Sequence, residues 1–372
     1  MKSKDQIQTE ALEAIGCFRR AGVEISMGVG KTLIGLKHMA AQYTPYRKYL
    51  VTAPKKKIFQ SWLDDMEKFG YGYLKEQIDF STYISLPKQS YDYDYVYLDE
   101  CHSLKATHNN WLYGYLKQGG RVLGLTGTYP TNPTSEKGKM CNFYCPRIYR
   151  YMPDEAIDDE ILNDYRIIIH ELTLSTKMNI PRIGPKGEFM SSEMRDYQYW
   201  NGRLDDAQTA SEQQLLRIKR MKALQDMPTK EHYARLLLQA QMEKTIVFAN
   251  TKKQADNLSE HSFHSSNPES EQNLELFKAG TIDKLSAVEQ LSEGVTIPGL
   301  RVGIIMHTYS NNRRAGQKIG RMLRLNPDDV ATIHVLCYVD TVDKEWTNNA
   351  LKAFDQSKIT RIKPMFYEGL HY

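Results

Sequence analysis

The stretch Met27-Gly28-Val29-Gly30-Lys31-Thr32 lies between a short apolar segment, Gly22 to Ser26, and a helical pattern that begins at Leu33. Glycines between a strand and a helix let backbone amides curl round phosphate oxygens, and the helix N-terminus adds partial positive charge. A lysine and a hydroxyl residue directly after them suit the β- and γ-phosphates and a magnesium ion. A full loop of this kind has a further glycine where this chain has Ile25. The stretch therefore predicts a nucleoside triphosphate site in an α/β domain, built from Gly28, Val29, Gly30, Lys31 and Thr32.

A second stretch, Tyr97-Leu98-Asp99-Glu100-Cys101-His102, places two carboxylates at the end of an apolar strand that we expect over 91–98. Open α/β sheets bind their ligands at the carboxyl ends of their strands. We expect Asp99 to hold magnesium together with Thr32. We expect Glu100 to orient and deprotonate an attacking water molecule.

A third stretch, Gln317-Lys318-Ile319-Gly320-Arg321-Met322-Leu323-Arg324, falls in a helix predicted over 312–324. Arginines three residues apart share one face of a helix, and they could simply be a solvated surface pair. Beside the other two motifs, we interpret Arg321 and Arg324 as catalytic residues, and the family resemblance described below implies the same for Gln317. The arginines would then supply positive charge to the γ-phosphate.

The composition is that of a globular protein large enough for two domains: 372 residues, 41% hydrophobic and 25% charged. It has no apolar run long enough to cross a membrane and no signal-peptide pattern at its N-terminus. The formal charge of +4 permits nucleic-acid binding without demanding it. Of the five cysteines, only Cys141 and Cys145 lie close together in the chain, and we interpret all five as reduced thiols of a cytosolic protein.

Alternating strand and helix signals appear at both ends of the chain. We expect strands over 22–26, 49–52, 91–98 and 122–126, and helices over 5–20, 33–43 and 58–69. A strand over 166–174, a hairpin around 184–187 and two or three helices over 191–243 follow. We then expect strands over 245–249, 284–288, 302–306 and 332–338, with helices over 251–260 and 312–324. The pattern predicts an α/β fold with two parallel-sheet domains, at 1–150 and 241–372, joined by a hairpin and helical connector at 151–240.

These motifs, in this order, resemble those of the superfamily 2 helicases, the group of DEAD/DEAH-type boxes, with Asp99-Glu100-Cys101-His102 as that box. The resemblance covers most of the chain. It implies two RecA-like domains with ATP and Mg²⁺ in the cleft between them, and Gln8 reading the adenine. It further implies that hydrolysis is coupled to domain movement by His102, Thr126, Gly127 and Thr128.

A motor that tracks a nucleic-acid backbone needs hydroxyls, amides and basic side chains that face phosphates. Candidates occur at strand ends and in segments that resemble helicase nucleic-acid motifs: Thr52, Pro54, Lys55, Thr82, Ser292, Gly294 and Thr308. The run of lysines that begins at Lys55 could equally be ordinary solvated charge.

The resemblance is greatest to compact phage recombination and branch-migration helicases of the UvsW and RecG kind. It implies an ATP-dependent DNA helicase that unwinds or remodels forks and branched DNA, working as a monomer in the cytoplasm. DNA, single-stranded or branched, is favoured over RNA. The alternatives are a translocase on duplex DNA that does not separate strands, an RNA helicase, and a non-enzymatic nucleic-acid-binding module.

Overall fold

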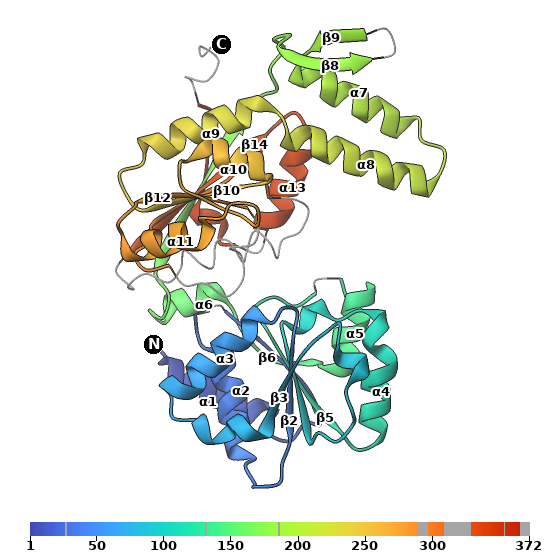
Figure 1. Ribbon diagram of the computed structural model, residues 1–372, viewed down its shortest axis with the longest axis vertical. Helices are drawn as coiled ribbons and strands as arrows, with labels where there is room; N and C mark the ends of the chain where they lie inside the picture. Colours follow the sequence, from blue (N-terminus) through green and yellow to red (C-terminus); the bar gives the residue numbers. More distant parts are fainter. Residues whose placement is uncertain are drawn as a thin grey trace. The chain divides into compact units, whose positions relative to one another are not determined.

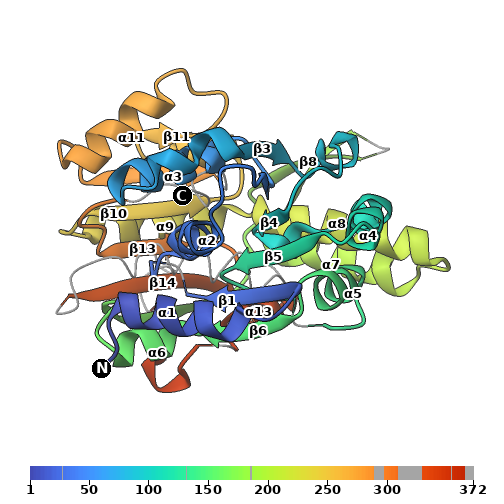
Figure 2. The ribbon, with the colours of Figure 1, turned by 90° about the horizontal axis from the view of Figure 1, so that it is seen from below.

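The structure is a computed structural model that describes residues 1–26, 28–130, 132–184, 187–288, 297–308, 329–352 and 354–364. The chain divides into two compact units, with the boundary between Asp164 and Tyr165. Each unit is built on a β-sheet covered by helices (Figures 1 and 2). This arrangement agrees with the α/β fold that the sequence predicts.

The first unit holds a sheet in the order β3-β2-β4-β5-β1-β6, with every neighbouring pair parallel. Its strands are β1 (Arg20–Ile25), β2 (Tyr49–Ala53), β3 (Ile78–Thr82), β4 (Tyr95–Asp99), β5 (Arg121–Thr126) and β6 (Arg147–Tyr151). Helices α1 (Lys4–Ile15), α2 (Lys31–Ala41) and α3 (Lys57–Lys68) cover one face, and α4 (Asn109–Lys117) and α5 (Glu136–Tyr144) cover the other (Figure 1). Helix α6 (Pro153–Asp158) follows β6.

The second unit holds a sheet in the order β11-β12-β10-β13-β14-β7-β15. Its strands are β7 (Asp164–Leu172), β10 (Thr245–Ala249), β11 (Ser262–Phe263), β12 (Lys284–Val288), β13 (Val302–Ile305), β14 (Val330–Tyr338) and β15 (Ile359–Ile362). Its helices include α9 (Pro228–Ala240), α10 (Lys252–Leu258), α11 (Ser270–Ala279) and α13 (Val342–Leu351).

The hairpin expected around 184–187 forms from β8 (Ile180–Gly184) and β9 (Gly187–Ser191), which pair antiparallel. It is followed by α7 (Glu193–Asp205) and α8 (Ala210–Gln225), and then by α9, so three helices cover the stretch for which the sequence predicts two or three. Figure 1 shows β8, β9, α7 and α8 standing beside the sheet of the second unit. The bounds of the expected connector, 151–240, stay a prediction. Strand β7, which lies within that range, joins the second sheet.

One predicted strand has the wrong start and the wrong pattern. The sequence predicts a strand over 91–98 with the tyrosines at 91, 93, 95 and 97 on one side, but β4 begins at Tyr95 and all five of its residues are buried. Tyr91 and Tyr93 precede the strand and pack, partly buried, against the core. An interior strand of a parallel sheet is covered on both faces. Alternating residue types along such a strand therefore do not distinguish a buried face from an exposed one.

The parallel topology brings distant parts of the sequence to one edge of the first sheet. Strands β1, β4 and β5 run in the same direction, so the loop after Ile25, the acid at Asp99 and the hydroxyl at Thr126 all lie at the carboxyl edge. The predicted helix over 312–324 lies outside the described residues. No helix in the described part of the chain is long and apolar enough to cross a membrane.

Candidate active site

The loop between β1 and α2 has the backbone that a phosphate-binding loop needs. Gly28 and Gly30 have φ angles of 93° and 102°, in the left-handed region that favours glycine. Gly30 is the N-cap of α2, so the amides of the first helical turn, beginning at Lys31, point toward the loop. A side chain at Gly30 would also collide with Gln8, because a Cβ there would lie 2.8 Å from its Nε2 atom.

Gln8 lies against this loop. Its side chain is 3% exposed, and its Nε2 donates a hydrogen bond of 2.8 Å to the carbonyl oxygen of Val29. The side-chain amide of Gln8, which belongs to α1, therefore holds the backbone of the loop in place. This places Gln8 beside the loop that we assign to the phosphates, while its contact with adenine stays a prediction.

Asp99 is a buried carboxylate at the end of β4, with 5% exposure. Its Oδ2 accepts a hydrogen bond of 2.9 Å from the indole Nε1 of Trp62, and its Oδ1 accepts one of 2.9 Å from the backbone amide of Glu100. Burial raises the pKa of Asp99 to about 6, and the adjacent Glu100 carboxylate adds to the rise. A nearby cation would favour the ionised form of such a carboxylate.

The carboxylate of Asp99 and a nearby hydroxyl would suit a magnesium ion, which prefers oxygen ligands. Thr32, the second residue of α2, carries the other predicted ligand, and its hydroxyl lies near the carboxylate of Asp65 from α3. Burial raises the pKa of Asp65 too. Asp99 and Thr32 would hold the ion, and Asp65 would orient the threonine hydroxyl.

Glu100 stands in an uncommon backbone conformation, with a φ of 51° that few residues other than glycine adopt. Its Oε1 lies 3.5 Å from the Nζ of Lys31, and its Oε2 lies 3.3 Å from the Nδ1 of His102. Burial opposes ionisation, but the charges of Lys31 and His102 outweigh it and hold the pKa of Glu100 below its ordinary value. Glu100 is therefore ionised at neutral pH and able to accept a proton.

The predicted coupling residues meet beside this carboxylate. The Nδ1 of His102 lies 2.7 Å from the Oγ1 of Thr126, and the same hydroxyl lies 3.4 Å from the Oε2 of Glu100. The amide of Thr128, on the far side of Gly127, donates to this hydroxyl at 3.2 Å. One polar cluster thus connects the ends of β4 and β5.

Two of the predicted nucleic-acid contacts are buried in this conformation. Thr52 is 0% exposed in β2, and Thr308 is 1% exposed, with its hydroxyl 3.1 Å from that of Thr347. Neither side chain is open to solvent in this structure, and their contact with nucleic acid stays a prediction.

Three other candidates reach the surface. Lys55 is exposed, and Pro54 and Thr82 are partly buried, all at the carboxyl edge of β2 and β3. The remaining site residues lie outside the described part of the chain: Ser292, Gly294, Gln317, Arg321 and Arg324.

The structure adds residues that sequence reasoning missed. Trp62 of α3 is fully buried, and its indole donates a hydrogen bond to Asp99. In the second unit, Lys230 is fully buried and paired with Asp343, and its Nζ also donates to the carbonyl oxygen of Met306 at 3.0 Å. No sequence signal marks this lysine, because a lysine on a helix is ordinarily exposed.

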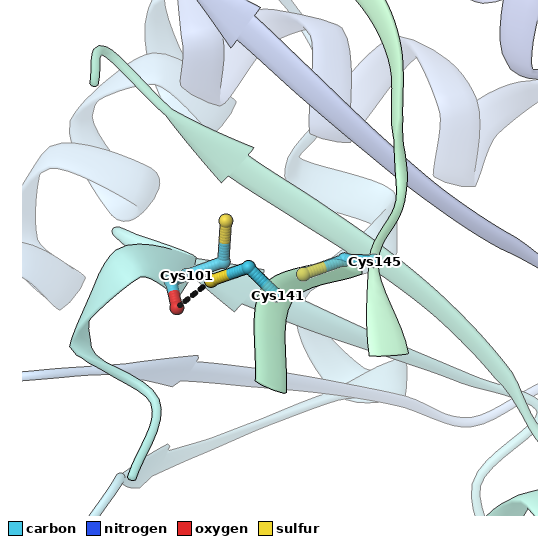
Figure 3. A group of neighbouring side chains, drawn as sticks. All are labelled: Cys101, Cys141 and Cys145. Atoms are coloured by element: carbon cyan, nitrogen blue, oxygen red, sulfur yellow. Dashed lines mark hydrogen bonds between the residues drawn. The ribbon is translucent and has the colours of Figure 1, made fainter. Parts of the chain in front are cut away.

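Three cysteines lie together beneath the catalytic candidates. The Sγ atoms of Cys101, Cys141 and Cys145 all lie within 4.8 Å of one another, and the thiol of Cys141 donates to the carbonyl oxygen of Cys101 at 3.4 Å (Figure 3). Burial raises the pKa of Cys101 well above its ordinary value, which keeps the thiol protonated. They pack against Gly124, where a Cβ would lie 2.6 Å from the Cβ of Cys145. The cluster therefore behaves as part of the core, as the sequence suggests for reduced thiols.

Comparison with protein families gives two matches. Residues 2–131 match the family "Type III restriction enzyme, res subunit", and residues 229–326 match the "Helicase conserved C-terminal domain". The second match includes the positions of Gln317, Arg321 and Arg324. No curated protein matches the chain.

Several solved structures share the fold at low sequence identity. Saccharomyces cerevisiae Dbp5 bound to RNA and ADP BeF3 has a TM-score of 0.58 and 12% identity, over 98% of this chain and 91% of that one. The ATP-dependent restriction-modification enzyme LlaBIII bound to DNA has a TM-score of 0.62 and 13% identity, over 98% of this chain but only 31% of its own. The helicase domain of Pyrococcus furiosus Hef has a TM-score of 0.52 and 16% identity, over 92% and 97%.

These likenesses extend over nearly the whole chain, so they confirm the predicted pair of RecA-like α/β domains. The match over residues 2–131 falls in the first unit and the match over residues 229–326 falls mainly in the second. Residues 2–131 thus match the restriction-enzyme family and residues 229–326 the helicase C-terminal family, on a fold that the solved helicase structures share.

Proposed function

We propose that the chain is an ATP-driven motor that hydrolyses ATP and moves along DNA. The observation that carries the proposal is the polar cluster at the carboxyl edge of the first sheet. There an ionised Glu100 lies between Lys31 and the Thr126–His102 pair, beside the glycine loop. Phosphoryl transfer to water requires backbone amides that bind the phosphates, a cation and a group that accepts the proton of the water. The cluster offers all three, and it also connects Glu100 to the next strand through Thr126.

In this proposal each residue has one task. The amides after Gly30 and the ammonium of Lys31 bind the phosphates, and Thr32 and Asp99 hold Mg²⁺, which neutralises phosphate charge when bound. Glu100 takes the proton of the attacking water. Arg321 and Arg324 supply further positive charge to the γ-phosphate, with Gln317 beside them.

The cluster also offers a route by which hydrolysis affects the rest of the motor. Glu100 shares its surroundings with Thr126 and His102, and Thr126 is bonded to the backbone of Thr128. We infer that a change in the proton or the partner of Glu100 shifts the loop after β5.

The preference for DNA rests on the resemblance to compact recombination and branch-migration helicases of the UvsW and RecG kind. The family match of residues 2–131 to a restriction-enzyme subunit also favours DNA. We propose single-stranded or branched DNA as the substrate and a monomer in the cytoplasm as the working form. The domain ranges 1–150, 151–240 and 241–372 belong to the same proposal.

The first test is an ATPase assay with wild type and Lys31→Ala. Loss of the ammonium should reduce turnover by about 10²-fold or more, because such groups stabilise charge that develops on the transferring phosphate. A variant that keeps more than about a tenth of wild-type turnover contradicts the assigned site. No turnover in wild type, with or without nucleic acid, would favour a non-enzymatic binding module.

The second test is a panel of forks, Holliday junctions, blunt duplexes and RNA hybrids, scored for stimulation of ATPase and for strand separation. Strand separation of branched DNA supports the proposal. Stimulation by blunt duplex without separation favours a duplex translocase, and a response to RNA alone favours an RNA helicase.

A further inference from the structure

An aromatic and basic stripe runs along α7 of the second unit, apart from the strand ends discussed above. It comprises Phe189 on β9 with Arg195, Tyr199 and Arg203 on α7, and we call it the α7 stripe. The three helical residues stand four apart, so they share one face. The guanidinium of Arg195 lies over the ring of Phe189 at 5.8 Å, and an Nη1 of Arg203 lies 3.4 Å from the hydroxyl of Tyr199. Arginine and aromatic groups thus alternate along one surface.

This stripe is open to solvent and carries positive charge. Tyr199 is 54% and Phe189 44% exposed, and both arginines are exposed. Within the described residues, neither Arg195 nor Arg203 has a carboxylate at ion-pair distance. Two guanidiniums without a carboxylate partner and one ring on the face of α7, with the ring of Phe189 from β9 beside them, are suited to a planar, anionic partner.

Two acidic residues of α7, Glu193 and Asp196, do not neutralise the stripe, because they are engaged on its buried side, whereas the third, Asp205, is exposed at the last position of the helix. Glu193 is fully buried and accepts hydrogen bonds from the amides of Ser175 at 2.9 Å and Thr229 at 2.7 Å. Asp196 is buried and paired with Arg182. Asp206, at the C-cap of the helix, marks the end of the stripe.

Gly202 is a second feature of this face of α7. It lies inside α7, one residue before Arg203, where glycine is unfavourable for a helix. A Cβ at this position would meet nothing within 4 Å, so packing within the protein does not require glycine. By helical geometry Gly202 lies on the same face as Arg195 and Tyr199. A glycine there leaves the helix backbone open to close approach by another molecule.

We propose that the α7 stripe binds single-stranded nucleic acid, with bases stacked on Phe189 and Tyr199 and phosphates bonded to Arg195 and Arg203. Exposed rings interleaved with arginines recognise unpaired strands, because every base offers a face for stacking. Bases within a duplex are already stacked on one another and are not free to stack on these rings. The inference rests on the proposed function. It adds a contact between the motor and its nucleic acid to those proposed at the ends of the β-strands.

The experiment measures the binding of a fluorescein-labelled oligothymidylate by fluorescence anisotropy, without nucleotide. Tyr199→Ala should weaken binding by about 5-fold or more, the loss expected for one stacked base. Gly202→Leu should weaken it similarly by filling the open space, while Gly202→Ala, which adds one methyl group, should bind more tightly than Gly202→Leu. Arg195→Ala should reduce the salt dependence of binding by about one phosphate contact.

The matched aromatic control is Tyr46→Ala, since Tyr46 is 92% exposed on the first unit and lies off the stripe. It should bind the oligonucleotide like wild type. Circular dichroism of each variant reports whether α7 remains folded. Oligouridylate and a blunt duplex complete the set of probes, and the duplex should be the least affected by Tyr199→Ala.

The outcomes separate this inference from the proposed function. If Tyr199→Ala and Gly202→Leu bind oligothymidylate like wild type while DNA still stimulates ATP hydrolysis, the motor stands and the stripe assignment is wrong. If wild type hydrolyses no ATP but both variants still bind the strand weakly, the stripe stands and the motor fails. Equal losses for duplex and single strand would overturn the stacking.

Discussion

The Nζ of Lys31 lies 3.5 Å from the Oε1 of Glu100, so the cation assigned to the phosphates and the carboxylate assigned to water are paired with each other. The pair joins the first residue of α2 to the residue after β4. The ammonium helps to keep the pKa of Glu100 below its ordinary value. A triphosphate that attracts Lys31 would take this partner from Glu100, which would make the carboxylate a stronger base.

Glu100→Gln should keep ATP binding and stop hydrolysis, because the amide preserves shape but cannot accept a proton. Turnover should fall while the affinity for a labelled ATP analogue stays within a few-fold of wild type. Glu160→Gln is the control, since Glu160 also has a positive φ, of 56°, and lies outside the site. Normal turnover in Glu100→Gln would place the base elsewhere.

Trp62→Phe should change the pH dependence of ATP hydrolysis. The indole bond to Asp99 favours the ionised carboxylate, so its loss should raise the pKa of Asp99 further above about 6. A protonated carboxyl cannot hold Mg²⁺, so the acid limb of the pH–rate profile should move to higher pH. The Mg²⁺ concentration for half-maximal turnover should also rise.

The matched control for this change is Trp111→Phe. Trp111 is also buried in the first unit, but its indole donates to the carbonyl oxygen of Gln89 at 2.8 Å. The control should leave the acid limb in place. Identical profiles for Trp62→Phe and wild type would remove Trp62 from the metal site.

Arg321→Ala and Arg324→Ala should each leave nucleotide affinity within a few-fold and reduce DNA-stimulated turnover by about 10³-fold or more, as loss of an arginine finger does. The measurement is an ATPase assay with and without DNA. Arg301→Ala, a surface arginine paired with Asp329 at 2.6 Å, is the control. Near-wild-type stimulation in both variants would assign the two arginines to an ordinary helix surface.

Lys55→Ala should flatten the dependence of DNA affinity on salt by about one phosphate contact, with no change in sequence preference. Lys55 is exposed at the carboxyl end of β2. The measurement is the slope of log affinity against log salt concentration. Lys75→Ala, at another exposed lysine of the first unit, should keep the wild-type slope. An unchanged slope for Lys55→Ala would identify its lysine run as solvated charge.

Stability should fall in weak acid because of two histidines in the core of the second unit. The Nε2 of His170 lies 2.8 Å from the Nδ1 of His334, and burial lowers the pKa of His170 to about 3 and that of His334 to about 4. The unfolded chain binds these protons near pH 6.5, whereas the folded chain does not. Stability is therefore present above pH 6.5 and is lost as pH falls toward about 4, by roughly 1.4 kcal/mol per pH unit for each histidine.

Urea unfolding between pH 7.5 and 5 measures this loss. His170→Gln should unfold with a shallower dependence on pH than wild type, whatever its stability at pH 7.5. His261→Asn, at a partly buried histidine of the same unit, should keep the wild-type dependence. Parallel curves for His170→Gln and wild type would contradict the burial argument.

Local rules determined much of this protein from its sequence. The apolar strands, the glycines with positive φ at Gly28 and Gly30, and the acids after β4 follow from the nearest residues alone. The direction of parallel strands then places Asp99 and Thr126 at one edge without further knowledge. Fold class and the core of the nucleotide site were therefore predictable.

Tertiary structure alone decided which polar side chains are buried and which partners they find. The indole of Trp62 reaches Asp99 across 37 positions of the chain, and Lys230 reaches Asp343 across 113. Thr52 turns inward although its position resembles a contact residue. The third thiol beside Cys141 and Cys145 comes from the catalytic box itself. Such contacts depend on how helices pack on the two faces of a sheet, and neither periodicity nor spacing along the chain encodes that packing.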